Sequence, residues 1–317
     1  MVWPRTETCV PHNPPRVGIV VRTKNRPWFL PRALADIAAQ EFDDWRVHIV
    51  NDGGDPADVT RTVGALPEAV RERVEVTHND SPRGRSAAAN QGVRALESEF
   101  VILHDDDDLW DRAFLSTAVA WLDEHSDDAG VVARTEIVYE RPDGRGGFVE
   151  SGRAIFWPEL TEITYAALLQ INRVVPIGHL YRRALHDEVG YYREDVHAAE
   201  DWEFNLRVAA RHRIGYITGK PLAFWMQRAG VHGELGNSMY ALAHEHTKYD
   251  AQIRDEALRE YVAKFGPGLP LYLASFLETE IARIVREEVD GALDRRPTLL
   301  GRVRRRLRRL FGARRPR

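Results

Sequence analysis

The chain has 317 residues, of which 44% are hydrophobic and 29% charged, and this composition is that of a soluble globular protein. Its single cysteine excludes an internal disulfide, no apolar run approaches the roughly 20 residues of a membrane-spanning helix, and the first residues lack the apolar core of a secretory signal. The net charge of −4 hides a division: residues 295–317 contain eleven arginines and no acid, whereas residues 1–294 carry −15. We therefore expect a cytoplasmic protein whose basic end has a partner of its own.

Residues 1–16 contain four prolines and no hydrophobic periodicity, which predicts an irregular arm. After this arm, short runs rich in β-forming residues alternate with helical patterns of about 10–15 residues. Such alternation predicts βαβ units and a mainly parallel, mixed sheet flanked by helices, which is an α/β fold. The predicted strands are 17–21, 46–50, 74–78 and 100–104, and the predicted helices are 28–40, 85–96 and 112–125.

The pattern changes at residue 131. Residues 131–139 and 148–152 flank the turn-forming segment Pro142-Asp143-Gly144-Arg145-Gly146-Gly147, which predicts a hairpin inserted in the sheet. The remaining predicted elements are strands 177–181, 214–217 and 223–226, which complete the sheet, and helices 165–171, 182–189, 198–211, 239–265 and 271–293. The predicted parts of the chain are the arm 1–16, an α/β domain 17–235, a helical region 236–297 and a basic tail 298–317.

Four consecutive aspartates, Asp105 to Asp108, directly follow the apolar run Phe100-Val101-Ile102-Leu103. Like charges so close together repel, so a folded protein needs positive charge among them. A divalent cation, Mg²⁺ or Mn²⁺, is the usual solution, and it in turn binds phosphates. The alternative is a solvated acidic turn in which Asp108 or Asp111 caps the next helix. The buried strand in front and Trp110 behind favour the metal site.

Polar residues follow three of the predicted strands: Arg22-Thr23-Lys24-Asn25-Arg26 the first, Asn51-Asp52-Gly53 the second, and the aspartates the fourth. The carboxyl ends of parallel strands share one edge of the sheet, where ligands bind. We therefore expect residues 22, 52 and 105–108 to line one pocket suited to a nucleoside diphosphate, in which Asp52 accepts a hydrogen bond from a base N–H. The alternative roles are turn formation for Asp52 and helix capping for Thr23 and Asn25.

Six motifs, in order and spacing, resemble glycosyltransferase family 2. Four of them are Val17-Gly-Ile-Val-Val-Arg-Thr-Lys-Asn-Arg-Pro27, Val47-His-Ile-Val-Asn-Asp-Gly53, Gly84-Arg-Ser-Ala-Ala-Ala-Asn90 and Val101-Ile-Leu-His-Asp-Asp-Asp-Asp-Leu-Trp110. The others, Glu200-Asp201-Trp202 with Leu206-Arg207 and Arg228 with His232 and Ser238, are similar to the family's acceptor-side and closing-loop motifs. The resemblance covers about residues 17–240. It implies the GT-A fold and a nucleotide-sugar-dependent glycosyltransferase that is typically inverting.

The resemblance also implies roles for single residues on the donor side. The implied donor-binding residues are Thr23, Asn25 and Asp52 at the nucleoside, Arg83 and Arg85 at the base or diphosphate, and Arg22, Asp105 and Asp106 beside them. Asp105 to Asp107 resemble the DXD motif, which implies a Mn²⁺ or Mg²⁺ ion with Asp107 as its direct ligand. The chain departs from the family pattern at Arg22, where proline is common, at Asn51, where aspartate is common, and at Ala89, where arginine is frequent. These departures bear on the nucleotide and sugar rather than on the fold.

Inverting transfer needs a base for the acceptor hydroxyl, and the resemblance implies that Asp201 is this base, with Glu200 as the alternative. Acidic residues are also common in the first turn of a helix for electrostatic reasons alone. Arg228 and His232 are expected on the phosphate side, with His232 as a possible further metal ligand or a structural residue. Packing roles are expected for Trp110, His104 and His179, and the role of Trp202 is left open.

The tail Leu299-Leu-Gly-Arg-Val-Arg-Arg-Arg-Leu-Arg-Arg-Leu-Phe311 has apolar residues at helical spacing among arginines. This pattern predicts a basic amphipathic helix that docks residues 298–317 on anionic lipid, at the inner face of the plasma membrane. A protein partner is the main alternative. Nucleic acid is disfavoured because the body carries −15 and no aromatic residues are interleaved for stacking.

We therefore expect a metal-dependent, inverting glycosyltransferase that moves a sugar from a nucleotide diphosphate donor to a glycan or lipid-linked acceptor, in cell-surface polysaccharide or glycolipid synthesis. One alternative is a sugar-phosphate nucleotidyltransferase, which would need a glycine-rich basic signature near the first strand. The other is a non-catalytic, membrane-associated relative that binds sugar nucleotides. The presence of Asp105–Asp107 together with Asp201 argues against that second alternative.

Overall fold

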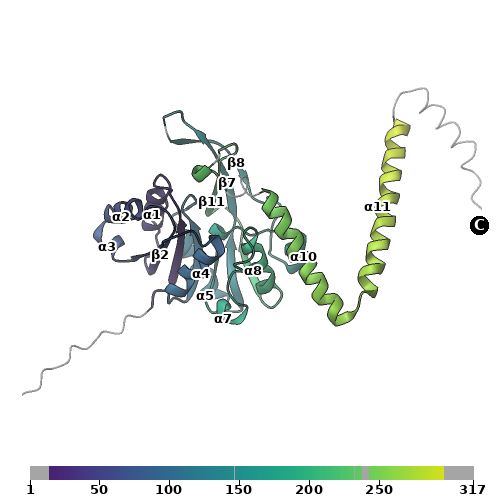
Figure 1. Cartoon of the computed structure of the whole chain (residues 1–317), viewed down its shortest axis with the longest axis horizontal. Coiled ribbons are helices and arrows are strands. Elements are labelled where there is room, and N and C mark those ends of the chain that lie inside the picture. The colour runs from purple at the N-terminus through teal and green to yellow at the C-terminus, as the bar shows by residue number, and fades with distance from the viewer. Residues whose placement is uncertain (1–13, 146, 232, 238–242, 296–317) are drawn as a thin grey trace, which may run out of the picture. The chain divides into compact units, whose positions relative to one another are not determined.

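The computed structural model describes residues 14–145, 147–231, 233–237 and 243–295 (Figure 1). The chain divides into two compact units, residues 1–251 and 252–317. The first unit contains all strands of the described residues. Most of the predicted arm and the whole of the predicted basic tail, 298–317, lie outside the described residues.

A seven-stranded sheet forms the centre of the first unit. The strand order is β10-β6-β9-β4-β1-β2-β3, and β9 alone runs antiparallel to its two neighbours. The predicted mainly parallel, mixed sheet is therefore confirmed. The strands are β1 (Val17–Thr23), β2 (Trp45–Asp52), β3 (Val74–Asn79), β4 (Phe100–Asp105), β6 (Asp128–Ala133), β9 (His179–Arg182) and β10 (Arg213–Ile217).

The central strand β1 is buried along its whole length, as expected for a parallel strand with helices on both faces. Its side chains alternate between two cores: Val17, Ile19 and Val21 belong to one apolar cluster, and Val20 belongs to the other. The first cluster includes residues of α1 (Leu30–Ala38), α2 (Pro56–Gly64) and α5 (Phe114–Glu124). The second includes residues of α4 (Arg85–Ala95), α6 (Tyr165–Gln170), α7 (Leu185–Glu188) and α8 (Glu200–Ala209).

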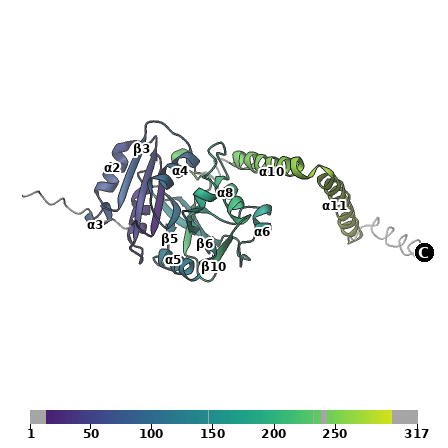
Figure 2. The same cartoon turned by 90° about the horizontal axis from the view of Figure 1, so that it is seen from below.

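Helix α4 lies directly on β1 because its sequence has a glycine at the contact. A Cβ atom on Gly92 would lie 2.3 Å from Cγ1 of Val20, which is closer than real Cβ atoms come. This close approach holds the first residues of α4 near the carboxyl end of β1. The edge strand β3 has α2 and the short helix α3 (Glu68–Arg71) beside it (Figure 2).

The predicted hairpin forms, since residues 135–142 pair antiparallel with residues 148–155. Neither this hairpin nor the predicted strand 223–226 belongs to the main sheet, so their predicted place in that sheet is wrong. A second sheet has the order β5-β11-β7-β8, formed by β5 (Leu109–Trp110), β7 (Thr135–Pro142), β8 (Phe148–Ile155) and β11 (Ala223–Gln227). The chain passes from β6 to β7 at Arg134, whose N–H and C=O bond to Ile217 and Leu222. Most residues of β8 are exposed, so this strand is unsuited to a sheet that is covered on both faces.

The remaining helices are short in the first unit and long beyond it. Two 3₁₀ turns, η1 (Pro176–Gly178) and η2 (Gly233–Leu235), border the strands β9 and β11. Helix α10 (Ala243–Phe265) begins in the first unit and continues into the second, and α11 (Gly268–Arg295) follows a break at Gly266, which has a φ of 81°. Among the described residues, no helix combines the length and apolarity needed to cross a bilayer.

Candidate functional site

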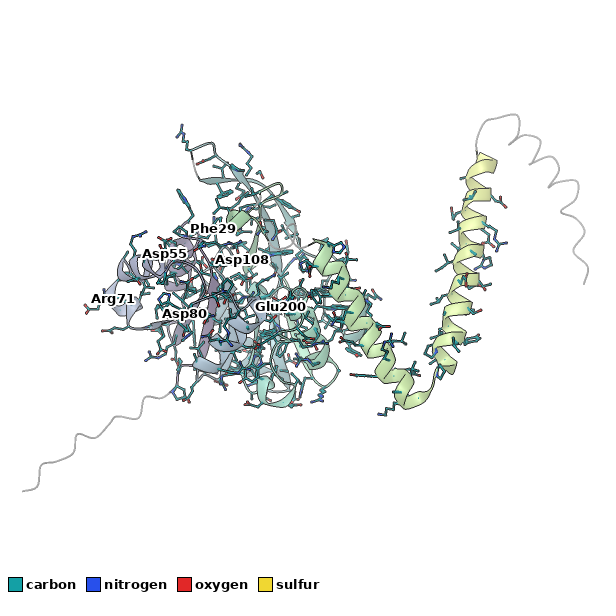
Figure 3. The ribbon with its side chains drawn as sticks, viewed as in Figure 1. Phe29, Asp55, Arg71, Asp80, Asp108 and Glu200 are labelled. Carbon is teal, nitrogen blue, oxygen red and sulfur yellow. The ribbon has the colours of Figure 1, made fainter. Side chains whose placement is uncertain are left out.

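A cavity of about 810 Å³ lies at the carboxyl ends of β1, β2 and β4. Its lining includes Arg22, Thr23, Asp52 and the four aspartates Asp105 to Asp108. The parallel sheet thus brings together side chains from three distant segments, as expected from the sequence. Asp108 and Glu200 lie inside the unit, in contrast to the exposed Asp55, Asp80 and Arg71 (Figure 3).

Arg22 links the acidic cluster to the start of α8. Its Nε and Nη2 atoms donate to Oδ1 of Asp105 at 2.9 and 2.6 Å, and its Nη1 donates to Oε1 of Glu200 at 3.3 Å. Arg85 lies near the same two carboxylates, 3.8 Å from Asp105 and 3.5 Å from Glu200. Burial opposes the ionisation of Asp105, but the charges of Arg22 and Arg85 outweigh it and lower the pKa of this carboxyl.

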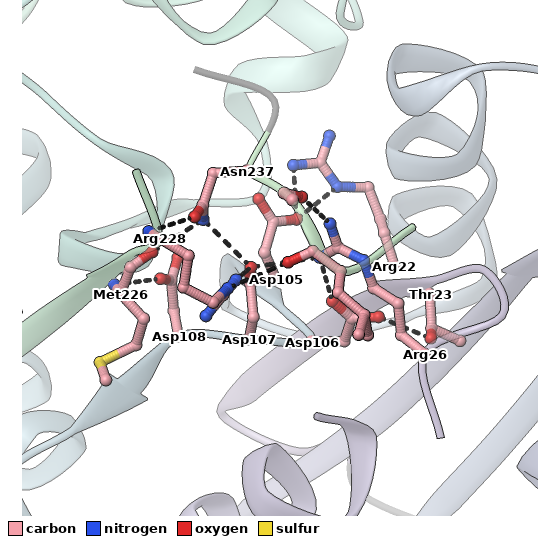
Figure 4. A network of polar contacts seen from close by, with 12 residues as sticks. Arg22, Thr23, Arg26, Asp105, Asp106, Asp107, Asp108, Met226, Arg228 and Asn237 are labelled. Carbon is pink, nitrogen blue, oxygen red and sulfur yellow. Dashed lines mark hydrogen bonds and ion pairs between the residues drawn. The ribbon is translucent and has the colours of Figure 1, made fainter. Parts of the chain in front are cut away.

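Arginines also neutralise the next two aspartates (Figure 4). Arg26 donates to Oδ1 of Asp106 at 2.9 Å and to Oδ2 of Asp107 at 3.1 Å. Thr23 donates its hydroxyl to the other oxygen of Asp106 at 2.6 Å. Burial raises the pKa of Asp106 to about 6, against the lowering effect of Arg26.

Arg228 is completely buried and pairs with two carboxylates, Asp107 and Glu140. Its guanidinium lies 4.2 Å from the ring centre of Phe29, and its backbone N–H donates to Asn237. It is absent from the residues that line the cavity. Arg228 was expected to contact a phosphate, but in the structure it does not face the cavity. It pairs with Asp107, which does, and so restrains that carboxylate.

Asp108 has a structural partner, since it accepts a hydrogen bond from the Met226 N–H at 2.9 Å. Burial and the neighbouring charge of Asp107 raise its pKa well above the usual value. Asp108 therefore ties the acidic loop to β11 and does not cap α5. Asp111 accepts from the N–H of Ala113 just before that helix, so the capping alternative holds only for the turn that precedes α5.

Two carboxylate oxygens at the cavity remain suited to a cation. Oδ2 of Asp105 and Oδ1 of Asp107 accept no hydrogen bond from the described residues, whereas Oδ1 of Asp105 and Oδ2 of Asp107 are taken by arginines. Mg²⁺ and similar ions are commonly bound by one or two carboxylates together with substrate phosphates. The donor set therefore fits a cation that arrives with a diphosphate. No group of three or more metal-ligating side chains occurs in the part of the chain that the structure describes, and His232 lies outside it.

Asp52 fixes the loop between β3 and α4. Its carboxylate accepts hydrogen bonds from the Asn79 side chain at 2.9 Å and from the backbone N–H groups of Arg83 and Gly84 at 2.8 and 2.9 Å. The turn-forming alternative for Asp52 is thus part of the structure, although the residue also lines the cavity. The loop packs closely on the β2 turn, because a Cβ on Gly53, which has a φ of 77°, would lie 2.5 Å from the Pro82 nitrogen.

Besides Arg228, two residues expected at the donor are absent from the cavity lining, namely Asn25 and Arg83. Asn25 has a φ of 52°, and its side-chain oxygen accepts the backbone N–H of Asp55 at 2.9 Å. Arg83 is exposed and contributes its backbone N–H to Asp52. The structure therefore gives both residues a role in shaping loops and brings Arg85 to the cavity instead.

Helix α8 presents two carboxylates with different electrostatic environments. It starts after Ala199, which has a left-handed φ of 65°, and this turn directs Glu200 and Asp201 to the cavity lining. Burial opposes the charge on Glu200, but Arg85 and Arg22 lower its pKa below the usual value. Burial and the charge of Glu200 raise the pKa of Asp201 to about 6, although Asn172 donates to its Oδ2 at 2.9 Å. Asp201 is therefore suited to accept a proton near neutral pH, and Glu200 is held as an ion.

The packing roles expected for three residues are confirmed. Trp110 is buried, stacks on Phe114 with 4.7 Å between ring centres and donates its indole N–H to the carbonyl of Ile177. His104 is fully buried at 4.3 Å from the Trp110 ring. Burial lowers the pKa of His179 to about 3, so this histidine stays neutral. Trp202 is also buried, and its indole N–H donates to the carbonyl of Leu168. Trp202 also lines the cavity.

Several lining residues were not expected from the sequence. Arg26 was within the motif after β1 but received no role of its own. Asn172, which holds Asp201, stands in an irregular segment without periodicity, and no sequence signal marked it. The other lining residues of this kind are Phe156, Trp157, Ile171, Val175, Pro176, Trp225, His246 and Asp250.

Residues 18–190 match the family model described as glycosyl transferase family 2. Over 219 residues, 68% of this chain and 76% of the relative, the sequence is 29% identical to an uncharacterized glycosyltransferase, YwdF, of Bacillus subtilis. It is 26% identical over 195 residues, 61% of this chain and 69% of the relative, to a PGL/p-HBAD biosynthesis glycosyltransferase of Mycobacterium tuberculosis. Among solved structures, the mannosyltransferase PcManGT from Pyrobaculum calidifontis, in complex with GDP-Man and Mn²⁺, has a TM-score of 0.55 at 17% identity and covers 96% of this chain and 89% of that one. The chain therefore belongs to glycosyl transferase family 2 and has the GT-A fold.

Proposed function

We propose that this glycosyltransferase is metal-dependent and inverting, and that it moves a sugar from a nucleotide diphosphate to a hydroxyl of a glycan or lipid-linked acceptor. One observation carries the proposal: the acidic cluster after β4 and Asp201 at the start of α8 line the same cavity. The acidic cluster would bind a cation that carries the diphosphate, and Asp201 would act as the base. The relative named as a PGL/p-HBAD biosynthesis glycosyltransferase supports a role in cell-surface polysaccharide or glycolipid formation.

The donor half consists of Asp105, Asp107 and the arginines beside them. Asp105 and Asp107 would hold Mn²⁺ or Mg²⁺ through the oxygens that accept no arginine hydrogen bond, with Arg85 at 3.8 Å from that oxygen of Asp105. Such an ion supplies charge that stabilises the departing diphosphate. Arg85, which stands at the first position of α4 and lines the cavity, adds a cation and a helix N-terminus that favour phosphate groups.

The acceptor half consists of Asp201 and the residues that hold it. The acceptor oxygen attacks the anomeric carbon, its proton passes to Oδ1 or Oδ2 of Asp201, and the bond from the anomeric carbon to the diphosphate oxygen breaks. A single displacement of this kind inverts the anomeric centre. Glu200 remains paired with Arg22 and Arg85 throughout, so its charge keeps the pKa of Asp201 above the usual value for an aspartate.

Two substitutions separate the roles of the halves. With a panel of nucleotide sugars and Mn²⁺, we expect wild type to hydrolyse one donor slowly in the absence of acceptor. Asp201→Asn should keep this hydrolysis and lower transfer by about 10²–10⁴-fold, which is the usual contribution of a general base. Asp107→Ala should lose both activities. Equal Mn²⁺-dependent activity of Asp107→Ala and wild type would contradict the metal assignment.

The location of the protein is a further part of the proposal. The basic, amphipathic sequence of residues 298–317 supports docking on the inner face of the plasma membrane, where lipid-linked acceptors are found. Flotation with anionic liposomes, for the full chain and for a chain that ends at residue 297, measures this directly. Equal flotation of the two chains would contradict membrane docking by this segment.

A further inference from the structure

A large part of the cavity lining is apolar and takes no part in the donor chemistry. It consists of side chains from the segments on either side of α6, from the turn before β9 and from β11, namely Phe156, Trp157, Ile171, Val175, Pro176 and Trp225. The polar side chain nearest to this group in sequence, Asn172, already donates its amide to Asp201. A sugar ring placed here would leave hydroxyl groups without partners, which is unfavourable.

The aromatic members of this wall are held in place. Phe156 and Trp225 meet edge to face, with 5.5 Å between ring centres. The Trp157 indole N–H donates to the Asn172 carbonyl at 3.2 Å, and the Arg173 guanidinium lies 3.8 Å from the centre of the indole. Trp157 has a φ of 52°, a left-handed conformation that is unfavourable for a residue with a bulky side chain and that clusters at ligand-binding positions.

The apolar wall is connected to the base through one residue. Asn172 accepts the Trp157 indole N–H with its carbonyl and donates its side-chain amide to Asp201 at 2.9 Å. A molecule that presents a hydroxyl to Asp201 therefore has its neighbouring atoms beside Trp157 and Ile171.

The apolar surface continues out of the cavity along α6. Ile171, which lines the cavity, is 46% exposed, and Leu169 and Tyr165 are 46% and 44% exposed. Tyr165 and Leu169 are four residues apart and so share one face of the helix, while Leu168 points into the core. We call Tyr165, Leu169 and Ile171 the α6 strip.

We propose that the acceptor is amphiphilic: its hydroxyl meets Asp201, its first apolar atoms lie on Trp157, and an extended alkyl chain leaves along the α6 strip. The inference rests on the proposed glycosyl transfer and deepens it, because it assigns the class of acceptor. A compact aromatic group would be covered by Phe156 and Trp157 alone, and only a longer chain reaches Leu169 and Tyr165. The wall and the strip have Ile171 in common, which lines the cavity and is 46% exposed, and the adjacent Asn172 bonds to the base.

The kinetic test compares acceptors that differ only in the apolar part. The full-length enzyme is assayed with methyl, phenyl and octyl β-D-glucopyranosides and β-D-galactopyranosides below the micellar concentration of the octyl compounds. We expect kcat/KM to increase from methyl to phenyl to octyl, with octyl at least about tenfold above methyl, as a few buried methylene groups would give. In the double variant Tyr165→Ser/Leu169→Ser, which changes two residues of the α6 strip outside the cavity lining, the octyl advantage should fall to the phenyl level through KM, while methyl acceptors and donor hydrolysis are unchanged.

A matched control is available in the second unit. Leu258→Ser/Leu271→Ser removes two leucines that are 48% and 68% exposed, away from the α6 strip in sequence. This control should keep the full octyl advantage. Equal kcat/KM for methyl and octyl acceptors, or the same loss in the control as in the strip variant, would overturn the inference while leaving glycosyl transfer intact.

A binding measurement gives an answer even if none of these sugars is glycosylated. A bromine atom quenches a nearby indole, so 8-bromooctyl β-D-glucopyranoside should quench part of the tryptophan fluorescence with saturation. That part should decrease in Trp157→Phe, which leaves Trp202 and Trp225 at the cavity, and weaken in Tyr165→Ser/Leu169→Ser. Quenching that is unsaturable, or is unchanged in Trp157→Phe, would count against an alkyl chain at this wall. The absence of donor hydrolysis by the wild type is a separate outcome, and it would contradict the proposed function.

Discussion

At the scale of single residues, the positive charge that four adjacent aspartates require comes from arginines of distant segments. Arg22 pairs with Asp105, and Arg26 pairs with Asp106 and Asp107. Arg228 also pairs with Asp107, and Asp108 accepts a backbone N–H. The sequence predicted the need for positive charge but assigned it to a cation alone. Arg85 lies 3.8 Å from the second oxygen of Asp105, and Arg26 and Arg228 bind one oxygen of Asp107. In the proposed function, a cation that arrives with the donor would add to the charge of these arginines.

The pH dependence of transfer is the first prediction at this scale. Asp201 must be ionised to accept a proton, so kcat/KM should rise with pH through about 6 and level off above it. Asn172→Ala removes a hydrogen bond that favours the carboxylate, so the acidic limb should move to higher pH. Glu200→Gln removes the neighbouring negative charge, so the limb should move to lower pH. A pH profile that shifts in the same direction in both variants would contradict Asp201 as the base.

The stability of the arginine pairs gives a second prediction. Arg228→Met would remove the buried partner that Asp107 and Glu140 share and leave them only the less buried Arg26 and Arg32, and removal of one member of a buried pair costs about 3–5 kcal/mol. Urea unfolding should show a loss of this size. The control is Arg153→Met, which removes an exposed pair with Glu150 and should cost at most about 1 kcal/mol. Similar losses for the two variants would show that the Arg228 pairs add nothing beyond surface contacts.

At the scale of elements, the strength of the local pattern decided what the sequence could predict. The strands β1, β2 and β4 are continuous apolar runs that end in polar residues, and all three were predicted near their observed bounds. Helices α2 and α3 were missed because only Val59 is buried in the first and no residue in the second, so no apolar period marks them. The second sheet was missed because pairing between β11 and β7 is a tertiary event that no local pattern records.

The contact between α4 and β1 gives a prediction about an element. Gly92→Ala would place a Cβ 2.3 Å from Val20 Cγ1, and such overpacking costs about 1–3 kcal/mol. Because Arg85 stands at the start of the same helix, donor binding should weaken as well. Gly64→Ala, at the end of α2 with no atom within 4 Å of its Cβ, should be neutral or stabilising by up to about 1 kcal/mol. Unfolding curves of the two variants decide the matter, and equal stability would place α4 farther from β1.

At the scale of the whole molecule, some residues of the site could be predicted from the sequence, and others depend on how distant loops meet in the fold. Residues at strand ends, such as Arg22, Asp52 and Asp105, were assigned from the sequence because topology alone places them at one edge. Asn172, Trp157 and the burial of Arg228 could not be predicted, since they depend on contacts between loops far apart in the chain. Arg228 and Asp107, for example, are 121 residues apart.

Ligand binding should stabilise the whole chain. A nucleotide sugar that binds only the folded protein adds about 2.7 kcal/mol at a concentration of 100 times Kd, and this raises Tm by roughly 5 °C or more. We expect one donor of a panel to produce this shift with Mn²⁺ and to lose most of it when EDTA is added. Asp107→Ala should lose the Mn²⁺-dependent part, and Asp80→Ala, an exposed aspartate outside the cavity, should keep it. A shift that EDTA leaves unchanged would contradict the metal site.

The arginine that sits behind Asp107 has a consequence for synthesis on the ribosome. The family match ends at residue 190, whereas Asp201, Arg228 and Asn237 are all translated later. A nascent chain at that point contains four neighbouring aspartates and lacks Arg228, which pairs with Asp107, so its acidic loop has yet to gain that restraint. A polypeptide released there would possess the family's signature without the proposed base. The part of the chain that is translated after residue 190 thus supplies both the proposed base and the buried arginine of the acidic loop.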